Sequence, residues 1–338
     1  MTTAPDLARL GELIPAPLRV RAATAEDLER LVEFLNEFAR PAQRNAIETV
    51  RRFETMNPQP NRLWLIVEDP AGSLMAVGQS TDNGIFAAKD GTFQVNVRVR
   101  PEQQRQGIGT ALLESLEANA RERGAPRAKS IVRGDEPEGS RFADRHGYRE
   151  MNRRYNSYVD VAAFEASRFD DPDAVAAKAG VRLASWAEMA KVRVSDLDSL
   201  QRESYEFAVT TGQDIPRPEP MPMPPYEAIR DVFFGPNSLV DGEATILALH
   251  DGRIVAETIT EQRTPGIFYT DFTGTAREWR GKGLALALKL RALRALKAQG
   301  AKLFGTTNDE QNAAMRGVNS KLGYVADPPV IEVEKPLK

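Results

Sequence analysis

The chain has 338 residues and no cysteine, and its 45 Lys and Arg against 48 Asp and Glu give a net charge of −3. That length suffices for two domains with separate hydrophobic cores. The nearly balanced charge excludes a general attraction to nucleic acid or to an acidic membrane surface. The absence of cysteine excludes disulfides, thiolate metal sites and a cysteine acyl-enzyme.

Signals for targeting and metal binding are also missing. No apolar run approaches the ~20 residues of a membrane span, and residues 1–13 lack the hydrophobic core of a signal peptide. The two histidines, His146 and His250, lie too far apart in the sequence to form a metal-ligand motif. We therefore expect a cytoplasmic protein without bound metal and without nucleic-acid or membrane partners.

The first half of the chain predicts alternating strands and helices. Residues 16–38 have the pattern of a strand and then an amphipathic helix, and residues 62–80 that of a hairpin turning at Pro70–Gly72. A strand that runs into a turn follows over Gln94–Gln103, and the next helix is expected to stop at Gly124.

The second half repeats this order. Residues 181–207 predict a strand and then a helix, residues 244–260 a hairpin and residues 267–275 a strand, after which a leucine-striped helix ends at Gly300. The charges and alanines of the intervening segment predict a linker or short helix. We expect an N-terminal domain over residues 1–160, a linker over 161–180 and a C-terminal domain over 181–338.

A glycine-rich hexapeptide joins strand to helix in each half. The sequences are QRQGIG (residues 104–109) and RGKGLA (residues 280–285), offset by 283 − 107 = 176 positions. Glycines let the chain turn tightly, so that backbone N–H groups and the positive end of a helix surround a phosphate. Neither loop has the Walker pattern, and Leu112 and Leu288 stand where a dinucleotide fingerprint needs a third small residue.

With their flanking strands and the segment TTNDEQNAAMRGVNSKLGY (residues 306–324), these loops resemble the acyl-CoA-binding pattern of the GNAT N-acetyltransferase superfamily. The same order of elements occurs in both halves of the chain, and this arrangement is similar to that of tandem GNAT proteins. The resemblance implies an α+β fold with two GNAT domains, each a mixed, mostly antiparallel central sheet flanked by helices. It also implies acetyl-CoA (coenzyme A) as the cofactor.

The resemblance assigns cofactor binding to backbone N–H groups before each loop, to the loops themselves, and to asparagines near the end of the second copy. These residues are Val97, Val99, Gln104, Arg105, Gln106, Gly107, Ile108, Gly109 and Thr110 in the first copy, and Thr273, Thr275, Arg280, Gly281, Lys282, Gly283, Leu284, Ala285, Asn308 and Asn312 in the second. The first copy matches less well, because Glu136 stands where the second has Asn312.

An amine acceptor, with a pKa near ~10, must lose a proton before it can attack a thioester. Strict alternation along residues 267–275 predicts that Asp271 shares a face with Thr273 and Thr275, which makes it the first candidate base. Glu257 on the neighbouring strand is the second candidate, although both acids also fit solvated strand positions. The corresponding strand of the first copy has no acid, which favours the C-terminal domain as the catalyst.

A departing thiolate needs a proton or a hydrogen bond, which the family commonly takes from a tyrosine. This chain has Asn319 and Ala143 at the corresponding positions, and an asparagine can donate a hydrogen bond but cannot protonate a thiolate. The candidates that remain are Tyr324, Tyr205 and water, and Tyr324 also fits a core aromatic.

The acceptor is expected to meet the acidic, proline-rich segment over residues 201–231. Its candidate substrate-binding residues are Tyr205, Glu206 and Asp214, because acids attract a cationic amine and prolines stiffen a wall. A proline-rich lid with merely solvated acids is the other interpretation of this segment.

We therefore expect a transferase that moves acetyl from acetyl-CoA directly to a primary amine of a small molecule, as a monomer or homodimer. Two alternatives stay open. One is a non-catalytic acyl-CoA-binding or sensing protein, and the other is acetylation of a protein N-terminus or lysine.

Overall fold

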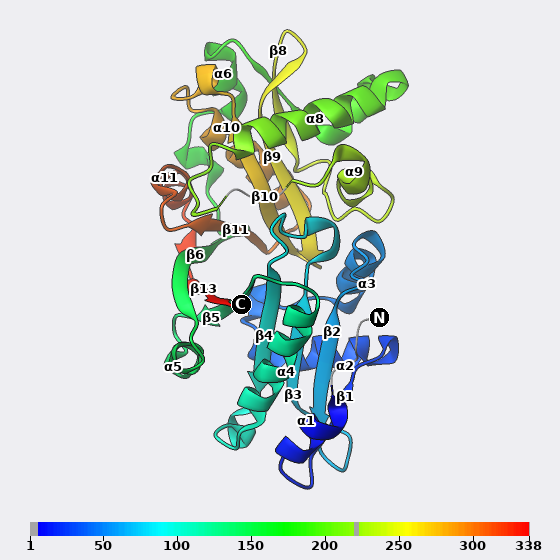
Figure 1. Cartoon of the computed structure of the whole chain (residues 1–338). Coiled ribbons are helices and arrows are strands. Elements are labelled where there is room, and N and C mark those ends of the chain that lie inside the picture. The colour runs from blue at the N-terminus through cyan, green and yellow to red at the C-terminus, as the bar shows by residue number, and fades with distance from the viewer. Residues whose placement is uncertain (1–5, 220–222, 338) are drawn as a thin grey trace. The chain divides into compact units, whose positions relative to one another are not determined.

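The computed structural model describes residues 6–219 and 223–337, and the chain forms two compact units. The first unit contains the chain up to Met151 and from Val330 onward, and the second spans Asn152–Pro329. Each unit is a mixed, mostly antiparallel sheet flanked by helices, as the sequence predicts (Figure 1).

In the first unit the strands pair in the order β1, β2, β3, β4, β5, β13, with β4 and β5 parallel and the other neighbours antiparallel. The strands are β1 (Arg19–Ala22), β2 (Leu63–Glu68), β3 (Leu74–Thr81), β4 (Phe93–Val99), β5 (Arg127–Arg133) and β13 (Val330–Pro336). The helices are α1 (Leu7–Leu13), α2 (Leu28–Phe38), α3 (Ile47–Met56), α4 (Ile108–Glu122) and α5 (Pro137–Arg145). Leu112 and Leu116 of α4 are buried in the core on one face, and Phe34 of α2 is buried on the other.

The second unit has the same strand order, β7, β8, β9, β10, β11, β6, with the short β12 also paired to β6 and only β10 and β11 parallel. The strands are β6 (Arg149–Asp160), β7 (Arg182–Ser185), β8 (Ile246–His250), β9 (Arg253–Thr264), β10 (Ile267–Thr275), β11 (Leu303–Asp309) and β12 (Val325–Ala326). The helices are α6 (Pro172–Lys178), α7 (Trp186–Val192), α8 (Leu197–Gly212), α9 (Tyr226–Phe234), α10 (Leu284–Ala298) and α11 (Ala313–Lys321). Helices α6 and α10 pack on one face, and α7 and α8 on the other.

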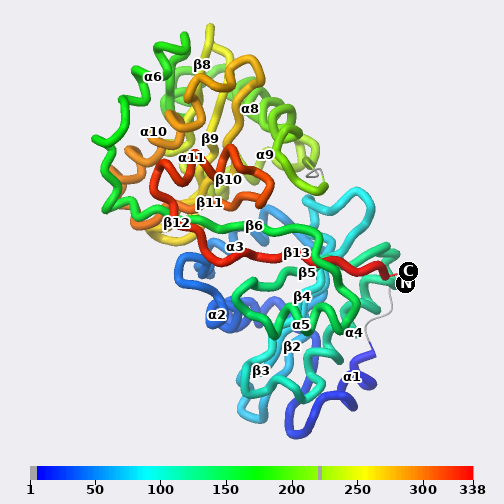
Figure 2. The backbone as a smooth tube through the Cα atoms, turned by 90° about the vertical axis from the view of Figure 1, so that its left-hand side faces the viewer, coloured from blue at the N-terminus to red at the C-terminus, as the bar shows by residue number. Residues whose placement is uncertain are grey.

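The last strand of each sheet comes from the other half of the sequence. β13 pairs with β5 in the first unit, and β6 pairs with β11 in the second (Figure 2). The units therefore differ from the predicted domains 1–160 and 181–338. The predicted linker 161–180 is also part of the second unit, where Val161 and Ala176 are fully buried. The repeat predicts the order of the elements, but the edge of the sheet that a strand joins depends on tertiary packing.

Glycines mark both ends of the two helices that follow the loops. Helices α4 and α10 begin directly after Gly107 and Gly283, and Gly124 and Gly300 follow their last turns. All four glycines have φ between 73° and 85°. Only glycine adopts this conformation without strain, so the predicted helix boundaries are confirmed.

Strand β10 departs from the strict alternation that its sequence predicts. Its register with β9 shifts between Thr270 and Phe272, so Asp271 is an extra, bulged residue. A Cβ on Gly274 would meet Thr211 of α8, whereas Thr273 bonds to Thr258 from the opposite face. Asp271 therefore does not belong to the alternating face of Thr273, and that prediction is wrong because a bulge resets the period.

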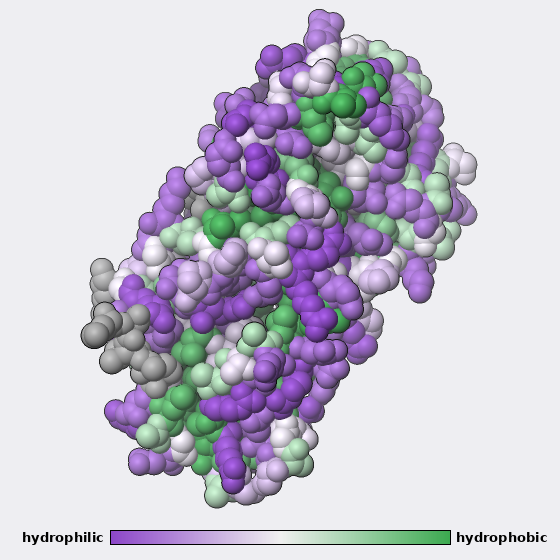
Figure 3. All heavy atoms as spheres, turned by 90° about the vertical axis from the view of Figure 1, so that its right-hand side faces the viewer, coloured by the Kyte–Doolittle hydropathy of each residue, from purple (hydrophilic) through white to green (hydrophobic). Residues whose placement is uncertain are grey.

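No helix within the described ranges is long and apolar enough to cross a membrane. The face of the molecule in Figure 3 is mostly hydrophilic, with smaller hydrophobic areas between the polar residues. This surface agrees with the 28% of charged residues in the sequence.

Candidate functional site

The strand before each glycine loop separates from its parallel neighbour. β4 pairs with β5 only at Phe93 and Gln94, and β10 pairs with β11 only over Ile267–Thr270. Beyond these residues the strands diverge, so the facing edges of β4 and β10 have no strand partner. We call the gap between residues 95–99 and β5 the first splay, and the gap between residues 271–275 and β11 the second splay.

Backbone N–H groups line the edge of the first splay. Across the β3–β4 pair, Arg100 N–H donates to the carbonyl of Met75. Successive residues of an antiparallel strand alternate between bonding to that partner and facing away from it. The N–H groups of Val97 and Val99 therefore face away from β3 and toward the first splay, as the sequence predicts.

The second splay has the same arrangement. Ala276 N–H donates to the carbonyl of Val255 across the β9–β10 pair, so alternate residues of β10 point away from β9. These are Thr273 and Thr275, whose N–H groups face the second splay. Both predicted pairs of backbone donors thus face a splay, and their role toward an acyl carbonyl stays a prediction.

The first residue of each loop folds back onto the preceding strand. Gln104 Nε2 donates to the carbonyl of Val99 at 3.1 Å, and Arg280 Nε donates to the carbonyl of Thr275 at 3.0 Å. These two contacts are equivalent in the repeat. The glutamine and the arginine therefore share a structural role, closing the turn that carries the loop amides.

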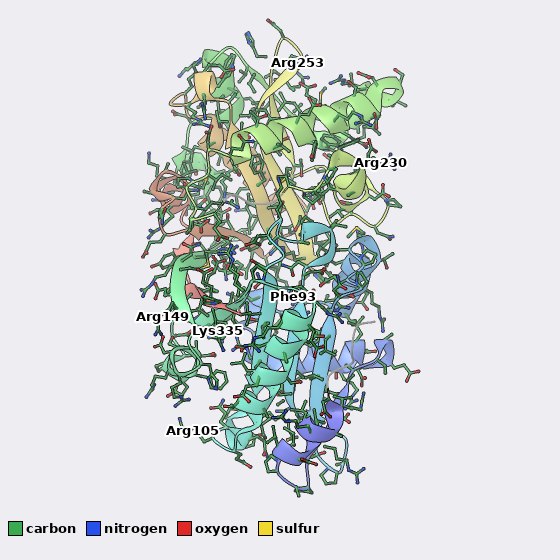
Figure 4. All side chains as sticks on the ribbon, in the orientation of Figure 1. Phe93, Arg105, Arg149, Arg230, Arg253 and Lys335 are labelled. Carbon is green, nitrogen blue, oxygen red and sulfur yellow. The ribbon has the colours of Figure 1, made fainter. Side chains whose placement is uncertain are left out.

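The second residue of each loop has a positive φ. Arg105 adopts 63° and Gly281 adopts 75°, and the side chain of Arg105 extends away from the ribbon (Figure 4). A Cβ on Gly281 would meet nothing within 4 Å. The second loop thus leaves open space beside its backbone at Gly281.

The first residues of α4 and α10 direct backbone N–H groups, and not side chains, toward the loops. Ile108 and Leu284 are buried in the two cores, and their helices begin with N–H groups that have no partner within the helix. Thr110 Oγ1 lies 3.1 Å from Nε2 of His146. Lys282 Nζ lies 4.2 Å from the ring centroid of Trp279, on the exposed side of its loop.

The remaining loop residues complete the two junctions. Gln106 Nε2 donates to the carbonyl of Glu102 at 3.3 Å, within the turn before α4. A Cβ on Gly109 would stand 3.4 Å from the ring of Phe142, so this position is close-packed against α5. Ala285 lies half-buried in the first turn of α10.

Asp214, predicted to bind the acceptor, instead contacts the second loop. Its carboxylate accepts hydrogen bonds from Arg277, at 2.9 Å from Nε, and from Arg280, at 2.6 Å from Nη2. These two guanidinium groups hold the pKa of Asp214 well below its usual range. Its charge is thus already neutralised by the arginines that flank the phosphate loop.

Glu257 lies in the interior of the second unit. It pairs with Gly274 in the β9–β10 register, between the two residues whose N–H groups face the second splay. The side chain has no exposed surface, and Oε2 accepts a 2.8 Å hydrogen bond from Ser204 Oγ of α8. Oε1 is buried and has no hydrogen-bond partner within the described residues. Burial raises the pKa of Glu257 to about 8, which is suitable for a base near neutral pH.

Asp271, the other candidate base, has a different environment. As the bulged residue of β10 its side chain keeps about a third of its surface exposed, 33%. Its carboxylate lies 3.9 Å from Nη2 of Arg263. Burial raises the pKa of Asp271 above its usual range, and the charge of Arg263 opposes this shift, whereas no cation among the described residues lies beside the enclosed Glu257.

Tyr324 packs in the core against Phe304, with ring centroids 6.1 Å apart. Its hydroxyl is buried without a hydrogen-bond partner among the described residues, and burial raises its pKa well above 10. Asn312 caps α11, where its Oδ1 accepts from Met315 N–H. Asn308 Oδ1 accepts a 2.6 Å hydrogen bond from Nδ2 of Asn319, the residue at the family's tyrosine position.

Tyr205 holds the proline-rich segment against α8. Its hydroxyl donates to the carbonyl of Pro224 at 2.8 Å, and its ring lies 5.5 Å from that of Tyr226. Glu206 is exposed on the same helix. Residues 220–222 of this segment lie outside the described residues.

The first splay differs from the second in chemistry. Asn96 Oδ1 accepts hydrogen bonds from Ser130 Oγ at 3.1 Å and from Ile131 N–H at 3.3 Å, so its amide bridges the gap between β4 and β5. Glu136 occupies the place of Asn312 and lies 3.2 Å from Arg133. Strand β4 itself contributes no acid.

Sequence reasoning missed two residues that touch the second site. Ser204 lies in an ordinary amphipathic helix, and only its tertiary contact with Glu257 distinguishes it. Lys289 interrupts the apolar pattern LALALKLRAL, which is a visible signal, but a lysine at such a position is usually at the surface.

The chain resembles solved structures over nearly its whole length. The GCN5-related N-acetyltransferase from Sphaerobacter thermophilus is 19% identical with a TM-score of 0.72, covering 96% of this chain and 97% of that one. A tandem GNAT protein from the clavulanic acid biosynthesis pathway is 18% identical with a TM-score of 0.70, covering 95% and 99%. A putative acetyltransferase from Pyrococcus horikoshii is 12% identical with a TM-score of 0.55, covering 96% and 91%.

These likenesses and the repeated loop–helix junctions define a protein with two units of the GNAT fold. The sequence model of the Acetyltransferase (GNAT) family matches residues 28–148 within the first unit. Residues 28–148 therefore match a family of N-acyltransferases that use acyl-CoA, and the likeness of the whole chain to solved structures shows the GNAT fold in both units. No curated protein sequence matches it.

The residues of the second unit fit an acyl-CoA molecule. Gly281 leaves open space beside the backbone of the loop, and Arg277, Arg280 and Lys282 surround the loop with positive charge. The N-terminus of α10 adds its partial positive charge. These groups would hold the pyrophosphate, and the edge of β10 would hold the arm that carries the thioester.

Proposed function

We propose that the protein is an acetyl-CoA-dependent N-acetyltransferase for a primary amine of a small molecule, with its active site in the second unit. The observation that carries this proposal is Glu257, a fully buried carboxyl group with one oxygen lacking a partner, placed opposite Gly274. A base is positioned beside the strand edge whose N–H groups polarise the thioester carbonyl.

Direct transfer assigns each group a task. Glu257, directly or through one water molecule, takes the proton that the acceptor ammonium must lose. The acceptor nitrogen then forms a bond to the acetyl carbon, and the C–S bond breaks with its electron pair passing to sulfur. As the C–S bond breaks, the nitrogen loses its second proton to solvent and the thiolate takes one from solvent. The N–H groups of Thr273 and Thr275 stabilise the charge that develops on the acetyl oxygen.

The first unit is proposed to lack turnover. Its splay is bridged by Asn96, its β4 has no acid, and Glu136 replaces the asparagine found in the second unit. A carboxylate at that position lacks the N–H donors that an asparagine amide can offer to the arm of the cofactor. These features support a unit that stabilises the protein, or that binds acyl-CoA without transferring the acyl group.

The acceptor is proposed to lie on the α8 face of the sheet, which Glu257 and Ser204 share. Neither acid predicted to bind the acceptor serves there, because Asp214 is occupied by two arginines and Glu206 lies on the exposed face of α8, about 200° around the helix from Ser204. A small amine fits this assignment better than a protein chain, because Tyr205 fastens the proline-rich segment against α8.

The direct test is release of the coenzyme A thiol from acetyl-CoA in the presence of a panel of small primary amines. Acetylated product, identified by mass spectrometry, should appear with at least one of them. Binding of acetyl-CoA without transfer to any amine in a broad panel would favour the sensing protein. Transfer only to peptide N-termini or lysines would favour a protein acetyltransferase.

A further inference from the structure

One lysine of the second unit is completely enclosed. Lys289 lies in the middle of α10 and has no exposed surface. Its ammonium lies 4.8 Å from the ring centroid of Tyr324 and 5.8 Å from that of Phe304. No carboxylate within the described ranges offsets this burial, which lowers the pKa of Lys289 to about 7.

Lys289 begins a chain of hydrogen bonds that leads to the second splay. Its Nζ donates a 2.8 Å bond to Oδ1 of Asn319, which is itself buried. Nδ2 of Asn319 then donates a 2.6 Å bond to Oδ1 of Asn308, on β11 at the edge of the splay. The ammonium form of Lys289 has no acceptor, so in that form it fixes which end of the Asn319 amide faces it.

The direction of the chain determines what Asn308 presents. Because its Oδ1 accepts from Asn319, the free end of the Asn308 amide is the Nδ2 group, a donor. Asn308 is half-buried, and no acceptor among the described residues takes up that donor. The chain therefore ends in an N–H group available to a ligand in the second splay.

We propose that Lys289 is a positioning residue of the second site. Through Asn319 it holds the amide of Asn308 with its N–H donors available to the arm or the thiolate of acyl-CoA. This inference rests on the function proposed above. In place of the tyrosine that the family commonly uses, this chain has Asn319 and Lys289. These residues orient a hydrogen-bond donor, the amide of Asn308, and do not supply a proton.

Folding alone does not explain a lysine at this position. A buried ammonium without a counter-ion is costly, and an apolar side chain of similar length would pack in the same space between Tyr324 and Phe304. Departures from apolar packing that reduce stability are expected mainly at functional sites. The chain to Asn308 is the contact that distinguishes Lys289 from a misplaced surface residue.

The test compares Lys289→Met with the wild-type full chain by three measurements. Calorimetry with coenzyme A should show binding weakened about tenfold, the loss of one oriented hydrogen bond. The kcat should fall by about the same factor, with an unchanged KM for the amine. Unfolding at pH 7 should show a variant at least as stable as the wild type, because a buried charge has been removed.

The pH dependence of unfolding gives a readout independent of activity. With a folded pKa near 7 and an ordinary unfolded value near 10.5, the wild type loses stability as the pH falls from about 10.5 to 7. Tyr324 is the titratable group that faces the ammonium, and its raised pKa keeps it neutral over this range. Lys289→Met should lack this loss.

Lys297→Met is the matched control, since Lys297 lies on the same helix and its ammonium bonds to the carbonyls of Ala162 and Phe164. It should leave binding of coenzyme A unchanged. Asn319→Leu interrupts the chain at a second point and decides the question if Lys289→Met fails to fold. Its effect should equal that of Lys289→Met, and the double variant should lose no more.

Two failures can be told apart. A wild-type protein that binds no coenzyme A refutes the proposed function. A wild-type protein that binds it, with Lys289→Met or Asn319→Leu binding and turning over equally well, refutes only the positioning role.

Discussion

Ser204 Oγ donates a 2.8 Å hydrogen bond to Oε2 of Glu257, joining helix α8 to strand β9 inside the second unit. The bond fixes the orientation of the carboxyl group and leaves Oε1 without a partner among the described residues. Burial opposes ionisation more strongly than the hydrogen bond favours it, so the pKa of Glu257 is about 8. The carboxyl group of Glu257 therefore ionises just above neutral pH, and the resulting carboxylate can act as a base.

Glu257→Gln should lower kcat by about 100-fold to 1000-fold, the range for loss of a general base. Glutamine keeps the size of the side chain and the contact with Ser204, so the variant should fold normally. The wild-type kcat/KM should rise with pH to a plateau above about 8, and the variant should lack this rise. Asp271→Asn serves as the comparison and should cost less than about tenfold; equal losses in both variants would contradict the assignment.

Ser204→Ala should shift the rising part of the pH–rate profile to higher pH. The serine hydroxyl stabilises the charged carboxylate and so lowers the pKa of Glu257, and its removal raises that pKa further above 8. The rate on the plateau should change little, because the base itself remains. A profile that stays in place, or moves to lower pH, is incompatible with this role.

Asp214→Asn should tighten the binding of coenzyme A by about threefold to tenfold, as an ion pair competing for Arg277 and Arg280 is removed. Calorimetry at low and high salt checks this, and the gain should shrink with added salt. An unchanged affinity for coenzyme A together with a raised KM for the amine would restore the acceptor role that the sequence suggests.

Lys335→Met should destabilise the first unit by about 2 kcal/mol. Lys335 lies on β13 and is labelled in Figure 4. Its Nζ contacts both carboxylate oxygens of the buried Glu117, at 2.9 and 2.7 Å. The remaining partners of Glu117 are Arg121 and the hydroxyl of Tyr148. Chemical unfolding measures the change, with the exposed Lys321→Met as control. An equal effect of both variants would mean that the C-terminal strand is held by other contacts.

The sequence alone predicts most of the fold, because the order of elements and the glycine junctions depend on local chemistry. Gly107 and Gly283 take a positive φ directly before a helix, and the glycines of the sequence predict this conformation. The hairpins and the amphipathic helices follow in the same way from periodicity. Both units therefore have the expected architecture.

The remaining features depend on contacts between distant residues. The bulge at Asp271 arises from the register between β9 and β10, and a strict period of two places this side chain on the wrong face. The exchange of β6 and β13 between the sheets separates the structural units from the sequence repeats. The Asn96 bridge and the enclosure of Lys289 likewise appear only once the strands and helices have packed.

The central claim is that the second unit performs the transfer, and the matched variants Gly107→Glu and Gly283→Glu test it most directly. Both glycines precede a helix with similar positive φ, so the two substitutions carry similar backbone strain and place a carboxylate beside the same kind of loop. The measurement is the rate of acetyl transfer to the best amine of the panel. We expect Gly283→Glu to abolish transfer while Gly107→Glu retains most of it. Full activity in Gly283→Glu with loss in Gly107→Glu would contradict the account.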